Sequence, residues 1–325
     1  MRRAQWWVKY RESIKCTLCP HYCLLNEDEY GKCKIRLNKN GKLRIPGYGK
    51  ITAQAADPVE KKPLYHFFPS SQVWSIGFTG CNLKCPFCQN YSISTASAVS
   101  GIYQSPLDSV LKAVNASCGI IAYTYSEPSI HIEYIMDTAA LAREYGLKNV
   151  LVTNGMLNPE PWEKLITIMD AVNIDLKSFE ASYYSKVLDG SLNTVKKNIV
   201  SAARATWVEL TTLVIPDDND DPEVFKTQVN WIKEISADIP LHLSAYYPSW
   251  KYTKEPTGIN KLKDFRNIAM EKLNFVYLGN IGAENNTSCP DCGYEVIKRR
   301  YYYTGNYLNK GKCPECGFAI PGVFT

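Results

Sequence analysis

The sequence predicts an α/β protein built on a partial (β/α)6 barrel, an incomplete relative of the eight-unit TIM barrel. A small cysteine-rich segment is expected before it, in residues 1–70, and a zinc ribbon after it, in residues 285–325. The barrel prediction for residues 71–284 comes from short apolar strand candidates that alternate with longer amphipathic stretches. Repeated β-then-α units form parallel sheets with right-handed crossovers, and six units are fewer than the eight of a closed barrel.

The elements are predicted by the period of their apolar residues. The strand candidates are Val73–Thr79, Gly119–Thr124, Asn149–Thr153, Ala171–Asp175, Val208–Ile215 and Leu241–Ala245. Amphipathic stretches predict helices near 106–117, 129–145, 159–168, 191–205, 222–236 and 259–273. Before residue 70, glycines between short apolar runs predict turns and small hairpins. Catalytic groups of such barrels lie at the C-terminal ends of the strands, so polar residues there are the site candidates.

Composition narrows the class of protein. The chain has 325 residues, 45% hydrophobic and 21% charged, as in soluble globular proteins. No apolar run approaches the ~20 residues needed to cross a bilayer, and the N-terminus has no apolar signal core, so we expect a cytoplasmic protein without a membrane partner. The net charge of +5 does not by itself indicate nucleic acid. Twelve cysteines in the cytosol indicate metal sites rather than disulfides.

The most informative motif is the three-cysteine loop Cys81-x3-Cys85-x2-Cys88, which directly follows the first strand candidate. A [4Fe–4S] cluster normally takes four thiolates, so three cysteines leave one iron free to bind a substrate or cofactor. Pro86 favours the non-helical path that turns three sulfurs inward, and Phe87 can shield a cluster from water. A structural zinc loop is the competing interpretation.

This loop is the motif of the radical S-adenosylmethionine (SAM) superfamily, which the chain resembles here. Over roughly residues 73–250 it is also similar to the glycyl-radical-enzyme activases, typified by pyruvate formate-lyase activating enzyme. The matching pieces are Cys88-Gln89-Asn90, Thr153-Asn154-Gly155, Asp175-Leu176-Lys177, Val214-Ile215-Pro216 with Asn219-Asp220-Asp221, and Pro240-Leu241-His242. The resemblance implies a SAM pocket lined by Asn90, Glu127, Asn154, Asp175, Lys177 and His242. Glu127 departs from the usual Gly-Gly-Glu pattern, because Tyr125 and Ser126 replace the glycines.

The resemblance also implies the chemistry. A [4Fe–4S] cluster held by the three cysteines would cleave SAM reductively into methionine and a 5′-deoxyadenosyl radical that abstracts hydrogen. The enzyme would be an oxidoreductase of the activase type (EC 1.97.1.-), served by a flavodoxin- or ferredoxin-type electron donor. SAM carries an ammonium, a carboxylate and a ribose diol, and carboxylate, amide and ammonium side chains suit such a ligand.

Nearly the whole chain is similar to one subgroup, the AmmeMemoRadiSam-system radical SAM enzymes. The resemblance is carried by Cys16-x2-Cys19-Pro20-His21-x-Cys23, Gly31-Lys32-Cys33, Gly41, Asp57-Pro58-x-Glu60-Lys61-Lys62-Pro63-Leu64-Tyr65-His66-Phe67 and Ile320-Pro321-Gly322-Val323-Phe324. It implies association with Memo-like and AMMECR-like proteins, and it supplies no substrate.

The C-terminal cysteines form two C-x2-C pairs, each followed by a glycine that permits a tight turn. The four ligands are Cys289, Cys292, Cys313 and Cys316. This pattern predicts a closed tetrahedral zinc site, with a single iron as the competitor. Between the pairs, the basic and aromatic run 298–303 is either two strands of the ribbon or a contact for single-stranded nucleic acid.

The N-terminal cysteines permit two interpretations. Cys16, Cys19, Cys23 and Cys33 could bind zinc or a second, fully ligated [4Fe–4S] cluster, and His21 could replace one ligand. Zinc is slightly favoured. The remaining cysteine, Cys118, is expected in the core.

Three functions stay open at this point. The first is a protein activase that places a glycyl radical on a partner, and the second is catalytic modification of tRNA or another RNA. A metal scaffold that has lost turnover is the third, and the intact cysteine loop argues against it.

Overall fold

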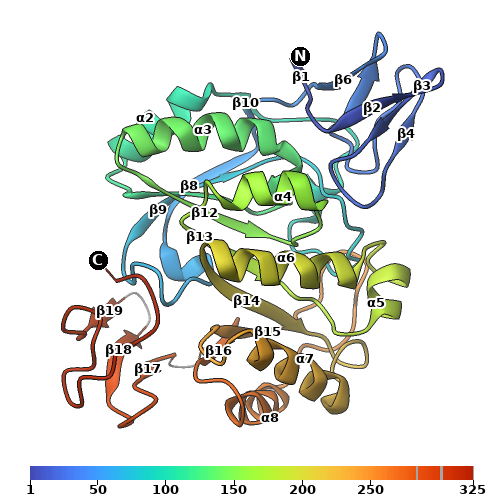
Figure 1. Cartoon of the computed structure of the whole chain (residues 1–325). Helices are drawn as coiled ribbons and strands as arrows, with labels where there is room; N and C mark the ends of the chain where they lie inside the picture. The colour runs from blue at the N-terminus through green and yellow to red at the C-terminus, as the bar shows by residue number, and fades with distance from the viewer. Residues whose placement is uncertain (283–284, 301–302, 325) are drawn as a thin grey trace.

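The computed structural model describes residues 1–282, 285–300 and 303–324 (Figure 1). An eight-stranded sheet forms its centre, in the order β16-β15-β14-β13-β12-β11-β9-β8. Seven strands are parallel: β9 (Gln72–Gly77), β11 (Ile120–Thr124), β12 (Lys148–Thr153), β13 (Ala171–Asp175), β14 (Trp207–Val214), β15 (Leu241–Ala245) and β16 (Val276–Gly279). The strand β8 (Ala53–Pro58) runs antiparallel to β9. Because β16 and β8 form the two edges, the sheet is a partial barrel, which confirms the predicted fold class.

Helices connect the parallel strands and cover one face of the sheet (Figure 1). They are α2 (Pro106–Asn115), α3 (Ile132–Glu144), α4 (Pro159–Ile166), α6 (Leu192–Ala205), α7 (Pro222–Ile235) and α8 (Ile259–Met270), with the shorter α1 (Tyr91–Ser94) and α5 (Ala181–Lys186). Two 3₁₀ turns, η1 (Val59–Lys61) and η2 (Pro128–His131), complete the set. Local sequence explains where helices begin: Ser105 and Asp108 form a capping box before α2, and Asp221 caps α7. Each predicted helix is present, with bounds within three residues of those expected.

The N-terminal residues form small antiparallel sheets, as predicted, beside the carboxyl ends of the barrel strands. The first sheet joins β1 (Arg2–Arg3), β6 (Lys42–Ile45) and β5 (Leu37–Lys39), and the second joins β2 (Trp7–Tyr10), β3 (Ser13–Cys16) and β4 (Leu24–Leu25). The strand β7 (Lys50–Ile51) pairs with β10 (Ile102–Tyr103). A buried ion pair of 2.6 Å between Arg36 and Glu133 of α3 fastens this unit to the barrel.

The amino-terminal ends of the barrel strands are closed by an apolar cluster. It combines residues that begin strands with residues of the 59–68 segment: Val73, Ile120, Val150, Ala171, Val59, Leu64 and Phe67. The backbone N–H of Phe68 donates to Val323 O at 2.7 Å, which ties the C-terminal segment to the same end. The carboxyl end of the sheet is therefore the end at which a site can open.

The C-terminal ribbon is a three-stranded sheet of β17 (Thr287–Ser288), β18 (Glu295–Arg300) and β19 (Tyr303–Asn306). Its core packs on Phe275 and Tyr277 at the start of β16. In Figure 1 the N-terminal sheets and the ribbon lie at opposite corners of the molecule. Among the described residues, no helix is both long enough and apolar enough to traverse a lipid bilayer.

Candidate functional site

The three-cysteine loop leaves the carboxyl end of β9 and leads into α1. The N–H of Leu83 donates to the Cys81 sulfur at 3.3 Å, and the Ser94 hydroxyl lies 3.2 Å from the Cys88 sulfur. Gly80, directly before the loop, has a φ of 96°, and a Cβ there would lie 2.6 Å from the carbonyl oxygen of Cys33. Glycine is thus required both for the backbone turn and for the close approach of the N-terminal unit.

A cavity of about 270 Å³ lies against this loop at the carboxyl ends of the strands. Its walls include the three cysteines and five of the six predicted SAM-pocket residues, namely Asn90, Glu127, Asn154, Asp175 and Lys177. The predicted wall residues that the structure brings together are up to 96 positions apart in the sequence, from residue 81 to residue 177.

Glu127 is the most constrained of these side chains. Its carboxylate is 1% exposed and accepts bonds from Thr153 Oγ1 at 2.6 Å, Asn154 N at 2.8 Å and Ser129 N at 3.0 Å. Burial raises the pKa of Glu127, and these hydrogen bonds oppose that shift. Its oxygens hold the β12 terminus in place.

The residues that replace the usual glycines before Glu127 have identifiable contacts. Tyr125 has a φ of 71° and its ring lies against Gly77 of β9, where a Cβ would be 2.6 Å away. Its carbonyl accepts from Asn90 Nδ2 at 2.6 Å, and Ser126 Oγ donates to Phe78 O at 2.6 Å. The backbone of residues 125–126 is therefore held in place by side-chain contacts, one of which is the hydrogen bond from Asn90.

Asn154 and the Asp175–Lys177 pair supply the remaining polar wall. Asn154 Nδ2 donates to Asn82 Oδ1 at 2.9 Å and lies 3.7 Å from the Cys81 sulfur. Lys177 Nζ lies 2.9 Å from Asp175 Oδ2. Burial opposes the charge on Lys177, but Asp175 and the Cys85 sulfur raise the pKa of Lys177 above its ordinary value. Burial also raises the pKa of the Cys85 thiol to about 11, and the Lys177 ammonium opposes that shift.

His242 stands apart from this group. It is the second residue of β15, so it lies near the amino end of that strand, where its ring nitrogen Nε2 is 2.6 Å from Glu209 Oε2. It is 3% exposed and does not belong to the cavity wall. Ser244, two residues further along and on the same face of the strand, lines the cavity instead.

Several wall residues were not anticipated from the sequence. Besides Ser244 they include Pro63, Thr211 and Asn280. Asn280 follows β16, a strand of four residues that the apolar pattern did not reveal. Pro63 belongs to the segment that enters the barrel after η1, and its carbonyl accepts from Asn173 Nδ2 at 2.8 Å.

The C-terminal cysteines form a compact cluster. All four sulfurs lie within 4.8 Å of one another, with Cys289–Cys316 and Cys292–Cys313 separations of 3.6 Å. Tetrahedral bonds of ~2.3 Å to one zinc ion would place sulfurs ~3.8 Å apart. Gly293 and Gly317 adopt φ of 77° and 80° in the two turns, as the C-x2-C-Gly pattern predicts. The arrangement fits a single bound metal ion.

The N-terminal cysteines lie in one small unit beside the loop of the barrel. Cys16, Cys19 and Cys33 are buried, and Cys23 is half-buried. Burial raises the pKa of Cys16 to about 11 and that of Cys19 to about 12. The backbone N–H of His21 donates to the Cys19 sulfur. The His21 ring turns to the cluster loop instead, with its Nε2 2.7 Å from Asn82 O.

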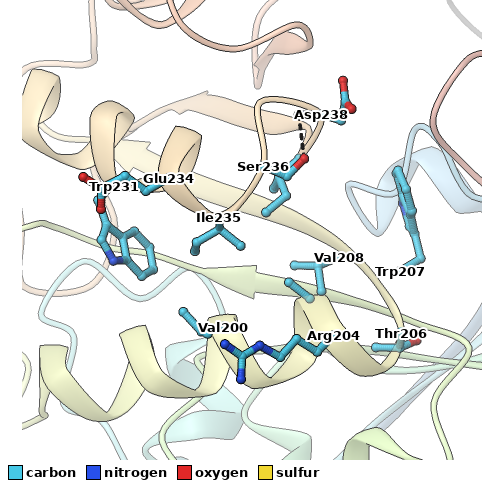
Figure 2. Close-up of a pocket in the computed structure, with 12 residues that line it drawn as sticks. Val200, Arg204, Thr206, Trp207, Val208, Trp231, Glu234, Ile235, Ser236 and Asp238 are labelled. Carbon is cyan, nitrogen blue, oxygen red and sulfur yellow. Dashed lines mark hydrogen bonds between the residues drawn. The ribbon is translucent and has the colours of Figure 1, made fainter.

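A second depression, of about 470 Å³, lies between α6 and α7 (Figure 2). Its wall includes Arg204, Trp231, Glu234 and Trp207, the first residue of β14. Trp207 marks the amino end of the strand, so this depression lies away from the carboxyl ends that carry the cysteine loop. The cavity beside that loop is therefore the candidate site.

Comparison with known proteins agrees with this geometry. Residues 75–227 match the radical SAM superfamily. The chain is 39% identical over 318 residues to the uncharacterized protein MJ0808 of Methanocaldococcus jannaschii, covering 95% of this chain and 94% of that protein. A stretch of 102 residues is 30% identical to the cysteine-type anaerobic sulfatase-maturating enzyme of Clostridium perfringens, covering 27% of each. The fold resembles Streptococcus suis SuiB with a TM-score of 0.52 and 12% identity, over 69% of this chain and 52% of SuiB.

The chain therefore belongs to the radical SAM superfamily, and its class of activity is radical SAM catalysis. The family implies a [4Fe–4S] cluster and SAM. The three thiols at the cavity, with an N–H and a hydroxyl beside two of their sulfurs, are a donor set that fits such a cluster.

Proposed function

We propose that this chain is a radical SAM enzyme that removes a hydrogen atom from a polypeptide, in the manner of a glycyl-radical activase. Cys81, Cys85 and Cys88 hold the cluster in this proposal. When bound, the cluster and SAM supply the carbon-centred radical that takes the hydrogen. The observation that carries the proposal is the convergence of three thiols and five polar side chains on one cavity.

The cavity's own side chains account for binding and orientation of SAM. Asp175 and Lys177 present opposite charges, which suit the ammonium and carboxylate of its methionine part. Asn154 is oriented by its bond to Asn82 and offers its amide beside the cluster loop. Glu127 acts as a positioning residue, because its oxygens are taken by Thr153 and backbone N–H groups. His242 is left out of the proposed pocket.

The size of the cavity favours a large substrate that inserts a small group. At about 270 Å³ its volume lies just below the ~300–1,000 Å³ that is usual for small-molecule pockets. SAM is itself a small molecule of the size that such pockets bind. Once SAM is bound, little room remains in the cavity for a second complete molecule. A polypeptide segment with a small side chain, such as glycine, meets this limit.

Contacts of the basic residues favour protein over RNA as the substrate. Lys32 and Lys84 both pair with Asp189, at 2.9 and 3.2 Å. In the ribbon, Arg299 is 8% exposed and lies over the Tyr65 ring at 4.3 Å. It is thus engaged inside the protein, at the end of the barrel opposite the cavity. Tyr301 and Tyr302 of the same run lie outside the described residues.

Further parts of the proposal concern metal and partners. The compact C-terminal cluster holds zinc in this proposal, because four thiolates at single-ion spacing suit that metal. Membership of the AmmeMemoRadiSam subgroup would add Memo-like and AMMECR-like partners and a flavodoxin- or ferredoxin-type electron donor. Cysteines that bind metal rather than form disulfides fit a reducing compartment such as the cytoplasm.

The test is anaerobic reconstitution with iron and sulfide, followed by dithionite and SAM, with 5′-deoxyadenosine as the readout. Wild-type protein should form it, and the Cys81→Ala variant should not. Cys118→Ala is the matched control, since it removes a buried thiol outside the three cysteine groups and should keep activity. Product formation by Cys81→Ala would contradict the assignment of the cluster loop.

The polypeptide substrate needs its own measurement. Deuterium from a candidate partner labelled at glycine should appear in 5′-deoxyadenosine. Salt-sensitive RNA binding accompanied by RNA-dependent SAM cleavage would favour RNA instead.

A further inference from the structure

The N-terminal cysteines are spaced differently from the C-terminal ones. Among the described residues, only Cys289, Cys292, Cys313 and Cys316 gather three or more ligand atoms within 4.8 Å. The sulfur of Cys19 nevertheless interacts electrostatically with those of Cys16, Cys23 and Cys33, so the four share one neighbourhood. One ion draws all its sulfurs onto a single centre, whereas a four-iron cluster gives each sulfur its own iron and holds them further apart.

The cysteine loop of the barrel provides an internal comparison. Cys81, Cys85 and Cys88, which suit a [4Fe–4S] cluster, likewise do not gather within 4.8 Å. The N-terminal unit therefore shares the open spacing of the cluster loop and differs from the single-ion spacing of the ribbon. This favours iron and sulfide over zinc at the N-terminal unit.

The N-terminal unit also touches the cluster loop directly. His21, between Cys19 and Cys23, has its Nε2 2.7 Å from Asn82 O, one residue beyond Cys81. On another side, Gly80 approaches Cys33 so closely that a Cβ would lie 2.6 Å from its carbonyl oxygen. Residues adjacent to a ligand in each group are thus in van der Waals or hydrogen-bond contact.

A carboxylate links the same two segments from outside. Asp189 pairs with Lys32, next to Cys33, at 2.9 Å and with Lys84, next to Cys85, at 3.2 Å. These partly exposed ion pairs are a further contact between the two segments that carry the cysteines.

The N-terminal unit has a side near solvent. Arg36 is 1% exposed and acts on the sulfurs of Cys16 and Cys33, but its guanidinium is paired with the Glu133 carboxylate at 2.6 Å, so this buried pair adds no net charge. Cys23, the least buried of the four, gives the unit a side near solvent where a donor protein can approach.

We propose that Cys16, Cys19, Cys23 and Cys33 hold a second iron–sulfur cluster that relays electrons to the Cys81–Cys88 cluster. One electron would enter the N-terminal cluster from a flavodoxin- or ferredoxin-type protein and one would leave it to the Cys81–Cys88 cluster, so the relay returns to its oxidised form. The electron ends on the SAM sulfonium, whose carbon–sulfur bond breaks. The relay rests on the proposed function, but the presence of the cluster does not.

The first test separates the presence of the N-terminal cluster from its role as an electron relay. The Cys81→Ala/Cys85→Ala/Cys88→Ala variant lacks the ligands of the barrel cluster. After anaerobic reconstitution and reduction with dithionite, it should still contain iron and show the EPR signal of a reduced [4Fe–4S] cluster. Adding Cys19→Ser and Cys33→Ser should remove both. Zinc in place of iron at the N-terminal unit, measured by elemental analysis, would overturn the proposal whatever the outcome for SAM cleavage.

The second test concerns the relay. In the Cys19→Ser/Cys33→Ser variant with an intact barrel loop, 5′-deoxyadenosine formation should be lost with reduced flavodoxin and retained with dithionite, a small reductant. A SAM-induced change in the EPR spectrum of the remaining cluster reports that the barrel loop is still folded. Full activity with flavodoxin, or equal loss with both reductants while that EPR change persists, would overturn the relay. Cys118→Ser is the matched control and should behave as wild type with both.

Discussion

The two four-cysteine units at the ends of the chain carry the same ligands but differ in sulfur spacing and in position. The C-terminal sulfurs sit at single-ion spacing, with two pairs 3.6 Å apart, and their ribbon packs at the amino end of the barrel. The N-terminal sulfurs are spread more widely, and their unit contacts the loop of Cys81 at the carboxyl end.

This difference teaches that cysteine count and spacing in sequence do not determine what a thiolate group does. Position relative to the cavity separates a group that can exchange electrons with the reaction from one that can only stabilise the fold. In a partial barrel the chemistry lies at the carboxyl ends of the strands, so the N-terminal unit is placed for the reaction and the ribbon is not. Each prediction below tests that separation.

The largest expected effect concerns the attachment of the N-terminal unit. Arg36→Met should lower the free energy of unfolding by about 3–5 kcal/mol, because it leaves the 2%-exposed carboxylate of Glu133 buried without its partner. Urea unfolding at pH 7 measures it.

Two further variants sharpen that result. Arg36→Met/Glu133→Leu should recover much of the loss, since no buried charge remains. Lys39→Met breaks an exposed pair with Asp28 on the same unit and should have no measurable effect. An Arg36→Met protein as stable as wild type would show that the unit is not held by this pair.

The next effect lies at the contact between that unit and the cluster loop. Gly80→Ala should slow 5′-deoxyadenosine formation by about 10²-fold, because a Cβ would be 2.6 Å from Cys33 O and Cys81 must shift. The control is Gly119→Ala, whose Cβ would meet no atom within 4 Å. Equal rates for the two variants would mean that the close approach at Gly80 has no role in positioning the loop.

The third effect concerns the protonation of His66, on the ribbon side of the molecule. Burial lowers the pKa of His66 to about 4, although Glu209 opposes that shift while Arg299 and His242 add to it. The unfolded chain therefore binds a proton that the folded chain does not between about pH 6.5 and pH 4, and stability falls as the pH falls through that window. From pH 7 to pH 5 the loss should be about 2 kcal/mol.

Because His66 contacts Pro321 O at 2.7 Å and Tyr277 Oη at 2.6 Å, this loss should loosen the ribbon first. Unfolding free energies of wild type and His66→Gln across this pH range give the measurement, since the variant lacks the titration and should lose less. Parallel pH profiles for the two proteins would contradict the assignment to His66.

Much of the site is predictable from the sequence because its parts follow clear strands. Asp175 ends the apolar run of β13, and Lys177 follows two residues later, so their place at the mouth follows from strand direction alone. His242 shows the limit. Whether it or Ser244 reaches the cavity depends on where β15 starts relative to its neighbours, which the local pattern of apolar residues does not encode.

Other parts depend on contacts between distant segments. The strand β16 was not predicted, because four residues carry too weak a period, and with it Asn280 at the cavity was missed. Sulfur-to-sulfur spacing is likewise a tertiary property: the sequence predicts metal at both ends of the chain, and only the folded chain separates compact from open spacing.

The smallest expected effect completes the comparison. Cys313→Ser should release the ribbon metal, yet dithionite-driven 5′-deoxyadenosine formation should stay within about twofold of wild type, since distant sites with no shared partners act independently. Its matched partner is Cys33→Ser, which should impair turnover with flavodoxin because its unit touches the loop of Cys81. Metal content and product are measured on the same samples. If Cys313→Ser abolished SAM cleavage while the cluster remained, the ribbon would have to act on the cavity through the barrel, and position alone would not separate the two units.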